Sequence, residues 1–88
     1  MPSHSVEFAP SAYRQFAKLD ASVRRRLAPA IEALAEDPRP GSAKRLVADD
    51  ELWRIRVDAY RVVYAIEDER LVVLVVRVGH RRDVYRNR

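Results

Sequence analysis

The clearest alternation of apolar and polar positions lies in two runs, residues 52–57 and 60–64, separated by only two residues. Both runs are rich in β-branched and aromatic side chains, and such a pair predicts a β-hairpin with a two-residue loop. That loop length fixes the register of the two strands. It pairs Val57 with Tyr60, Arg56 with Arg61, Ile55 with Val62, and Trp53 with Tyr64.

The two faces of this predicted hairpin differ in character, because successive side chains of a strand point to opposite faces. One face carries aromatic and aliphatic side chains and is expected to join the core. The other face carries Arg54, Arg56 and Arg61. Arg56 and Arg61 lie directly opposite each other, and like charges in that arrangement are destabilising. An anionic ligand would relieve this repulsion, so the basic face is the first candidate for a functional site.

Helical periodicity is confined to the first forty residues. A short edge strand is predicted at residues 6–8, and a short amphipathic helix runs from Pro10 to about Leu19. Asp20 is placed to cap a second helix, whose apolar residues recur at helical spacing. Pro29 falls inside this pattern but off its apolar stripe, which predicts a kink in one continuous helix. The stripe consists of Val23, Leu27, Ile31 and Leu34.

Four further segments complete the chain. Residues 37–42 are rich in Pro, Gly and Ser and predict a loop, and residues 44–47 follow it as a short strand. Residues 71–78 are apolar at both parities, which indicates a central strand covered on both sides. Gly79 is expected to end that strand. Residues 80–86 then form a basic tail that is able to fold back over the basic face.

The order of predicted elements is β-α-α-β-β-β-β, and it defines the fold class as α+β. Two N-terminal helices are expected to pack on one face of a small, mainly antiparallel twisted sheet, in a single domain spanning residues 1–88. They should cover the face that carries Trp53, Ile55 and Tyr64. The arginine-bearing face is then left open.

Composition narrows the setting in which such a domain works. The chain contains no cysteine, which excludes disulfides and thiolate metal sites and fits a reducing compartment. Its start shows no basic-then-apolar leader, and the longest apolar run, residues 71–76, is far too short to span a bilayer. We therefore expect a cytoplasmic protein without a membrane partner.

Charge indicates what this protein binds. The net charge is +4 at pH 7, a balance expected of a protein that contacts nucleic acid or an acidic protein. Both lysines lie early in the chain, and from Arg54 onward every Lys or Arg position is occupied by arginine. The planar guanidinium suits bidentate contacts with phosphate better than the ammonium of lysine does.

Side chains suited to catalysis are few. The chain has two histidines, and its acidic residues cluster at turns where their oxygens do not converge, so we expect no metal and no cofactor. Neither a Gly-rich phosphate loop nor a nucleophile elbow occurs. The residues that remain for catalysis are the arginines, His80 and Tyr85.

This set suits the attack of an RNA 2′-hydroxyl on its neighbouring phosphate. The substrate carries its own nucleophile, so the protein need only position the phosphate and stabilise the charge that develops there. Arg61 is the strongest candidate for that role, since it lies in mid-sheet among basic neighbours. Arginine does not deprotonate in proteins. His80 is therefore the candidate proton acceptor, and Tyr85 is placed to transfer a proton or to stack on a base.

Seven blocks that span nearly the whole chain together form a recognisable pattern. They are Phe8-x-Pro10-Ser11-Ala12, Lys18-Leu19, Ala30-Ile31-x-x-Leu34, Asp37-Pro38-Arg39-Pro40, Leu52-Trp53-Arg54-Ile55-Arg56, Tyr60-Arg61-Val62-Val63-Tyr64 and Val78-Gly79-His80-Arg81-Arg82-Asp83-Val84-Tyr85. In this order they resemble the RelE/ParE superfamily of bacterial toxins, and most of all its RelE branch.

The resemblance implies a toxin that cleaves mRNA in the A site of a translating ribosome without a metal ion. It also implies a cognate antitoxin with an acidic toxin-binding segment that covers the basic face. In such systems the toxin–antitoxin complex represses its own operon, which implies contact with operator DNA through the antitoxin.

By position, the resemblance also implies roles for individual residues. Arg61 matches the phosphate-binding arginine of the family, Arg81 the arginine that follows the glycine, and Tyr85 the C-terminal tyrosine. Two positions depart from the family, because Arg54 and Arg56 stand where the best-known members carry lysines, one of them suspected as the base. The complete candidate set is Arg56, Arg61, His80, Arg81 and Tyr85 for catalysis, with Arg54, Arg56, Arg61 and Arg82 for binding RNA phosphates.

Two other functions remain open on the sequence. The ParE branch shares the fold but inhibits DNA gyrase and cleaves no RNA. A third interpretation is a non-catalytic module whose arginine-bearing face docks an acidic protein. The combination of Arg61, Arg81 and Tyr85 favours the ribonuclease, although fold alone never fixes function.

Overall fold

Five strands and two helices make up the structure, a computed structural model that describes residues 4–47, 49 and 51–82. The strands form one sheet in the order β1-β5-β4-β3-β2, with β1 parallel to β5 and every other pair antiparallel. The predicted order and the α+β class are confirmed. In chain order the elements are β1 (Ser5–Phe8), α1 (Pro10–Ala17), α2 (Ala21–Ala33), β2 (Lys44–Arg45), β3 (Leu52–Val57), β4 (Tyr60–Glu67) and β5 (Val72–His80).

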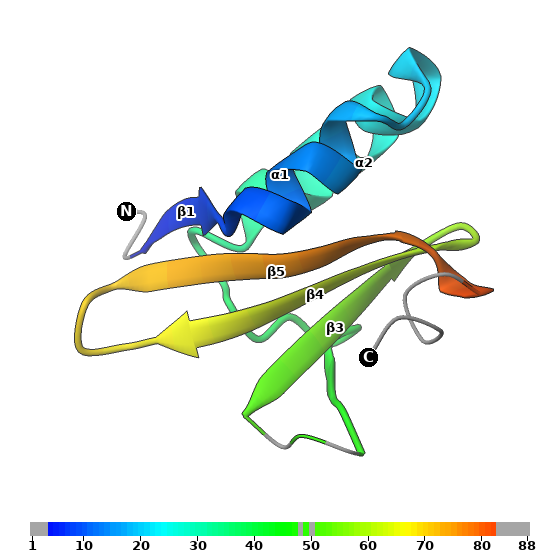
Figure 1. Ribbon diagram of the computed structural model, residues 1–88. Helices are drawn as coiled ribbons and strands as arrows, with labels where there is room; N and C mark the ends of the chain where they lie inside the picture. The colour runs from blue at the N-terminus through cyan, green and yellow to red at the C-terminus, as the bar shows by residue number, and fades with distance from the viewer. Residues whose placement is uncertain (1–3, 48, 50, 83–88) are drawn as a thin grey trace.

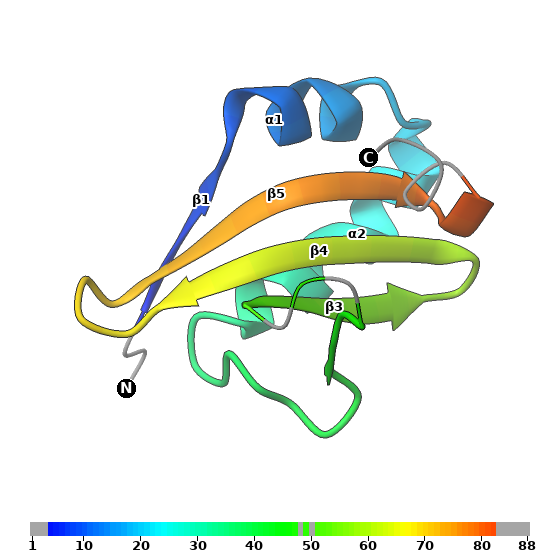
Figure 2. The same ribbon diagram turned by 60° about the horizontal axis from the view of Figure 1, so that its bottom comes forward.

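Both helices lie on the same side of the twisted sheet, as Figures 1 and 2 show from two directions. Helix α1 lies over β5, and α2 lies over the half of the sheet that contains β3 and β4. The core forms between these two layers, as expected. Its buried side chains come from α1, α2 and three strands: Ala12, Val23, Leu27, Ile31, Leu34, Ile55, Val62, Tyr64, Val73, Val75 and Val78.

The two helices confirm most of what their sequence predicts. Pro10 begins α1, where a missing N–H leaves no bond unmade. Pro29 lies inside α2, exposed to solvent, and the helix continues past it to Ala33. Asp20 occupies the N-cap position of α2, but its side chain makes no capping bond. Its backbone carbonyl instead accepts the N–H groups of Val23 and Arg24, each at 3.0 Å.

The β3–β4 hairpin has the register that its two-residue loop predicts. All four expected pairs occur, including Arg56 opposite Arg61 and Trp53 opposite Tyr64. Asp58 in the loop has a φ of 55°, the left-handed conformation that tight hairpin loops require and that Asp tolerates better than most residues.

Strand β5 departs from its prediction at both ends and in the middle. It runs from Val72 to His80, so the expectation that Gly79 ends it is wrong. Gly79 instead pairs with Arg61 of β4. Halfway along, Val63 pairs with Arg77 while the next residue, Tyr64, pairs with Val75. Val76 is therefore an extra residue in β5, and such a β-bulge reverses the face on which every later side chain lies.

The outer edge of β5 is supported by two different means. Residues 72–75 pair with β1, as expected for an interior strand, and Ala9 then donates its N–H to the carbonyl of Val75 at 2.8 Å. Beyond that point α1 supports the edge, because the side-chain oxygen of Gln15 accepts the Val78 N–H at 2.9 Å.

Neither helix in the described part of the chain has the length and apolarity needed to cross a membrane.

Candidate functional site

The sheet face opposite the helices gathers basic side chains from four strands. Residues that are directly opposed on neighbouring strands share a face. The registers therefore place five cations on this face, which we call the arginine face: Lys44, Arg54, Arg56, Arg61 and Arg77. They fall into two cross-strand rows, described in turn below.

The first row contains the Arg56–Arg61 pair and ends at Gly79 of β5. Gly79 has no side chain, so no side chain of β5 lies directly opposite Arg61. Arg56 is exposed, whereas only 6% of Arg61 is accessible to solvent. The expectation of an open face is therefore wrong at Arg61, although the helices leave this face of the sheet uncovered. A buried guanidinium must be paired, and Arg61 does interact within the chain.

The second row runs Lys44, Arg54, Val63, Arg77 across all four antiparallel strands. Lys44 is exposed, and Arg54 and Arg77 are half-buried. Val63 lies between the two arginines and is only 1% exposed, although no helix covers this face of the sheet. The stems of long basic side chains can cover apolar surface in this way.

Sequence reasoning missed Arg77 for an identifiable reason. Uninterrupted alternation along β5 would place Arg77 on the same face as Val73 and Val75, which belong to the core. The bulge at Val76 turns Arg77 to the arginine face instead. A bulge leaves no mark in a run of valines, so the amino-acid pattern held no signal for it. Lys44 was missed because its strand had no predicted register.

The same bulge moves His80 away from the arginine face. His80 pairs with Tyr60, and their rings make an edge-to-face contact with centroids 5.6 Å apart. Its Nδ1 accepts the backbone N–H of Arg82 at 3.3 Å. A neutral imidazole in that arrangement carries its proton on Nε2. The structure thus does not bring His80 to Arg61, and the geometry favours a role in holding the turn after β5.

The chain leaves the sheet immediately after His80. Arg81 donates its backbone N–H to the carbonyl of Ala59 in the β3–β4 loop, at 2.9 Å. Arg81 and Arg82 have helical backbone and exposed side chains beside that loop. Tyr85 lies outside the described residues, as does the rest of the predicted basic tail beyond Arg82.

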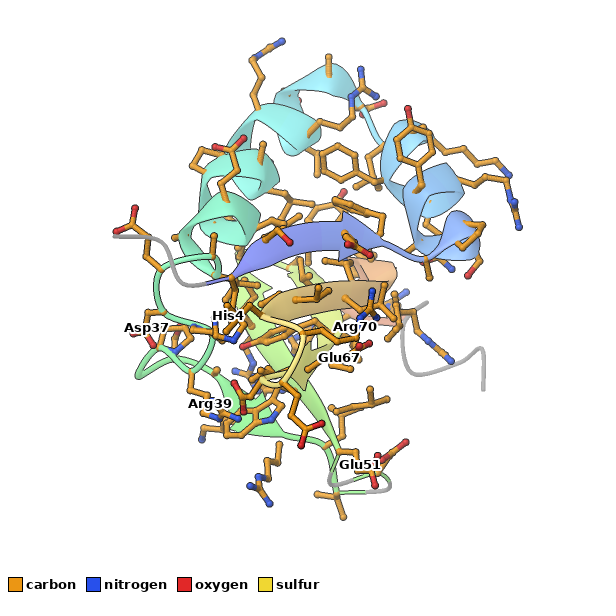
Figure 3. The ribbon with its side chains drawn as sticks, turned by 90° about the vertical axis from the view of Figure 1, so that its left-hand side faces the viewer. His4, Asp37, Arg39, Glu51, Glu67 and Arg70 are labelled. Carbon is orange, nitrogen blue, oxygen red and sulfur yellow. The ribbon has the colours of Figure 1, made fainter. Side chains whose placement is uncertain are left out.

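A polar cluster ties together the opposite end of the sheet. Figure 3 shows His4 and Arg39 at this end of the sheet. Arg39 donates to one oxygen of Asp68 at 2.9 Å, and His4 contacts the other at 3.1 Å. These two hydrogen bonds hold the pKa of the Asp68 carboxyl below its usual value, and the bond from Arg39 has the larger effect. The guanidinium of Arg39 also lies 5.6 Å from the ring centroid of Trp53, and that of Arg45 lies 5.2 Å from it. The cluster joins five segments of the chain: the residue before β1, the loop after α2, β2, β3 and the β4–β5 turn.

Tyr64 connects this end of the sheet to the loop after α2. Its side chain is fully buried, and its hydroxyl donates to the carbonyl of Pro38 at 2.7 Å. Burial, together with the nearby Asp37 carboxylate, raises the pKa of the Tyr64 phenol to about 12. A phenol held neutral and bonded to backbone is a structural group, as predicted for this residue.

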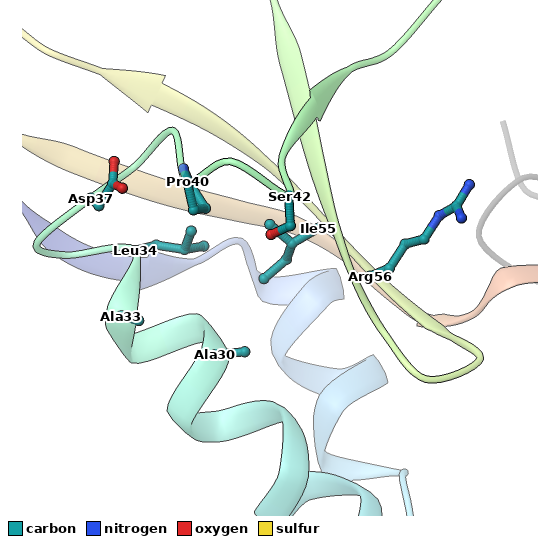
Figure 4. A pocket seen from close by; sticks show the side chains of 8 residues that line it. All are labelled: Ala30, Ala33, Leu34, Asp37, Pro40, Ser42, Ile55 and Arg56. Carbon is teal, nitrogen blue, oxygen red and sulfur yellow. The ribbon is translucent and has the colours of Figure 1, made fainter.

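A pocket of about 310 Å³ opens between α2, the loop that follows it and β3. Ala30, Leu34 and Ile55 form part of its apolar wall. Figure 4 shows the Leu34 and Ile55 side chains extending toward the space, while Arg56 points away from it. The pocket therefore adjoins the arginine face without containing its charges.

Within the described residues, no three His, Cys, Asp or Glu side chains are placed to hold a metal ion.

The fold and the arginine face define a small basic α+β protein with five cationic side chains on one face of its sheet. Comparison with known proteins gives the class a name. Residues 6–85 match the family described as ParE toxin of type II toxin–antitoxin system, parDE, and the chain belongs to this family within the RelE/ParE toxin superfamily.

Individual relatives carry RelE names. A RelE-like toxin protein of Escherichia coli is 33% identical over 85 residues, covering 93% of this chain and 90% of that protein. The mRNA interferase toxin RelE of Escherichia coli is 32% identical over 80 residues, covering 90% and 84%.

The solved structures that share this fold are also RelE-type toxins. A toxin–antitoxin complex from Mycobacterium tuberculosis gives a TM-score of 0.80 at 27% identity, covering 91% of this chain and 93% of that one. The isolated Escherichia coli RelE toxin gives 0.78 at 29% identity, covering 88% and 83%. The predicted superfamily is therefore confirmed.

Proposed function

We propose that this chain is a toxin that cuts mRNA on the ribosome, without a metal ion, using the RNA 2′-hydroxyl as nucleophile. One observation carries the proposal: Arg56 lies directly opposite Arg61 on the sheet face that the helices leave uncovered. Like charges directly opposite each other on neighbouring strands repel, and an anion that binds both reduces that repulsion. The relatives named mRNA interferase support an RNA phosphate as that anion.

The proposed cleavage needs few protein groups, because the RNA supplies its own nucleophile. The 2′-oxygen attacks the neighbouring phosphorus, the bond from phosphorus to the 5′-oxygen breaks, and a cyclic phosphate and a 5′-hydroxyl result. One proton leaves the 2′-hydroxyl and one reaches the departing 5′-oxygen. Negative charge grows on the phosphate oxygens between these events, and preorganised guanidiniums stabilise it.

Each arginine has a distinct part in this proposal. Arg61 is held rigid by its burial in the middle strand and stabilises the charge on the reacting phosphate. Arg56 is exposed and able to meet the RNA first. Arg54 binds the adjoining backbone, and Arg81 and Arg82 contact RNA from beside the β3–β4 loop.

The reaction requires a group that accepts the proton of the 2′-hydroxyl. His80 stays a prediction for that role, and its geometry requires the Nδ1 contact with Arg82 to break before that nitrogen takes a proton. Tyr85 stays a prediction as well, as a proton donor or a stacking partner for a base.

A cognate antitoxin is the expected protein partner. Several of the similar solved structures are toxin–antitoxin complexes. We propose that an acidic segment of the antitoxin covers the arginine face and blocks RNA, since the same charges serve both ligands. The complex would reach operator DNA through the antitoxin.

In vitro translation followed by primer extension on the message tests the proposed function. The wild-type chain is expected to produce cuts at codon-defined positions, and a preparation with antitoxin is expected to produce none. Intact message in the presence of folded toxin would contradict the proposal.

The family match supports a second candidate, because the matching family is named for the ParE toxin. A ParE-type toxin would inhibit DNA gyrase and leave mRNA whole. A supercoiling assay run beside the translation assay separates the two functions. A chain that binds RNA or antitoxin but affects neither assay would instead be a binding module.

A further inference from the structure

We propose that Arg77 is an RNA-binding residue of the arginine face, aligned with Arg54 and Lys44 to hold the backbone of a single-stranded RNA. This inference deepens the proposed function and rests on it for the identity of the ligand. It assigns a ligand to the second cross-strand row, which lies beside the pair expected to act on the reacting phosphate.

The alignment follows from the registers of three strand pairs. Lys44 is opposite Arg54, Arg54 is opposite Val63, and Val63 is opposite Arg77. Neighbouring strands are about 4.8 Å apart, so the backbones of Arg54 and Arg77 are separated by about 10 Å, with Val63 between them. Side chains as long as arginine can converge over that distance on one phosphate or span two.

The spacing between the two rows suits a polynucleotide. Arg61 and Val63 are two residues apart on β4, which separates the rows by about 7 Å along the strand. Neighbouring phosphates of an extended RNA strand lie at a comparable separation. An RNA with its reacting phosphate at Arg61 would therefore bring an adjacent phosphate to the row that contains Arg77.

The position of Arg77 depends on a specific irregularity of the backbone. Without the extra residue Val76, Arg77 would lie on the core face among Val73 and Val75. Turning a charged residue out of the core favours folding. The bulge also brings Arg77 into line with two other cations, Arg54 and Lys44, and this alignment is the placement that binding an RNA backbone requires.

Arg77 already interacts within the chain. This contact is compatible with RNA binding, since a guanidinium has five N–H donors and can keep one partner while it binds a phosphate. A purely structural role, covering Val63 with the apolar stem, is the competing explanation. Arg77→Met keeps an apolar stem and removes the charge, whereas Arg77→Lys keeps both.

The test measures binding of a fluorescent single-stranded RNA whose 2′-hydroxyls are methylated, so that cleavage is impossible. Anisotropy titrations over a range of KCl concentrations give the dependence of log K on log[KCl]. Arg77→Met is expected to weaken binding several-fold and to reduce this slope by about 0.7, the amount for one phosphate of a single strand. Arg25→Met is the matched control, because Arg25 is exposed on α2 in the other layer.

Arg77→Lys and Arg25→Met are both expected to keep the wild-type slope. A slope for Arg77→Met equal to that of Arg25→Met would overturn the proposal, and so would a wild-type chain that fails to bind the probe. Equal losses in Arg77→Lys and Arg77→Met would also overturn it, by assigning the effect to packing. Failure of the proposed function looks different, since the wild type would then bind the probe with these slopes yet leave translated mRNA uncut.

Discussion

The side-chain oxygen of Gln15 in α1 accepts the backbone N–H of Val78 in β5 at 2.9 Å. Val78 follows the bulge at Val76, at the point where β1 no longer covers the edge of β5. This bond therefore satisfies a donor that the sheet itself leaves unpaired on that side. It also fixes the segment that carries Arg77 and Gly79 onto the arginine face.

Replacing Gln15 by Met is expected to destabilise the protein by about 1 kcal/mol, because a part-buried N–H loses its acceptor. Gln15→Glu keeps an oxygen at the same place and is expected to be close to the wild type. Urea denaturation measures the free energy of unfolding, and hydrogen exchange at the Val78 amide shows whether the loss is local. Equal stability of the two variants would show that the bond contributes nothing.

The fold was predictable from sequence because its main signals are local. Hairpin loop length set the β3–β4 register, and helical spacing set the buried face of α2. The bulge in β5 was missed because it depends on contacts that are not local in sequence. Val72 to Val76 are apolar at every position, so neither parity marks the core face, and the bulge depends on contacts with α1 and β4 that lie far away in sequence.

Removing the guanidinium of Arg61 is expected to abolish mRNA cleavage by the proposed ribonuclease. Arg61→Met keeps much of the side-chain volume in this buried position and removes the charge that stabilises the transition state. Loss of one such preorganised donor typically reduces the rate by about 100-fold or more. Primer extension during in vitro translation measures the remaining cleavage.

Two controls make that result interpretable. Thermal unfolding must show that Arg61→Met is folded at the assay temperature, since a buried charge also supports its partners. Arg25→Met removes the same charge from the exposed surface of α2 and is expected to cleave at the wild-type rate. Full activity in folded Arg61→Met would remove this residue from the mechanism.

The role of His80 is separable by two substitutions that imitate different ring nitrogens. Asn places an acceptor near the position of Nδ1, which bonds the Arg82 N–H, whereas Gln reaches toward Nε2. If His80 only holds the turn, His80→Asn is expected to keep the cleavage rate and its pH dependence. His80→Gln is expected to be several-fold slower at every pH.

A proton-accepting His80 would give a different result. Both variants would then lose activity, and the pH dependence of the cleavage rate would change in both. Cleavage rates from pH 5.5 to 8.5 distinguish these outcomes. The second result would restore the role that the sequence suggested and would require the His80 ring to turn during the reaction.

The candidate site was only partly predictable, and His80 shows why. Sequence reasoning grouped it with Arg61 because residues 80–86 were expected to form a tail that folds back over the basic face, whereas His80 is the last residue of β5. Whether two such side chains meet depends on parity, and one extra residue between Val75 and Arg77 reversed it. The burial of Arg61 was also hidden, since strand alternation assigns a side chain to a face but does not say how far it is buried there.

Tyr64 predicts how stability changes in alkaline solution. Its phenol is neutral and buried in the folded chain, where its pKa is raised from 10.0 to about 12. The neutral form is therefore favoured by folding, and the contribution is fully present below pH 10. It is lost as pH rises from 10 to 12, by up to about 3 kcal/mol for a shift of this size.

Tyr64→Phe isolates this contribution from all other alkaline titrations. The variant loses the hydrogen bond to the Pro38 carbonyl and is expected to be about 1 kcal/mol less stable at pH 8. Between pH 10 and 11.5 its free energy of unfolding should fall less steeply than that of the wild type, so the difference between the two chains shrinks and then changes sign. Urea denaturation of both chains at a series of pH values measures it. A constant difference across this range would mean that Tyr64 ionises as easily in the folded chain as in the unfolded one, and that its burial does not protect the neutral phenol.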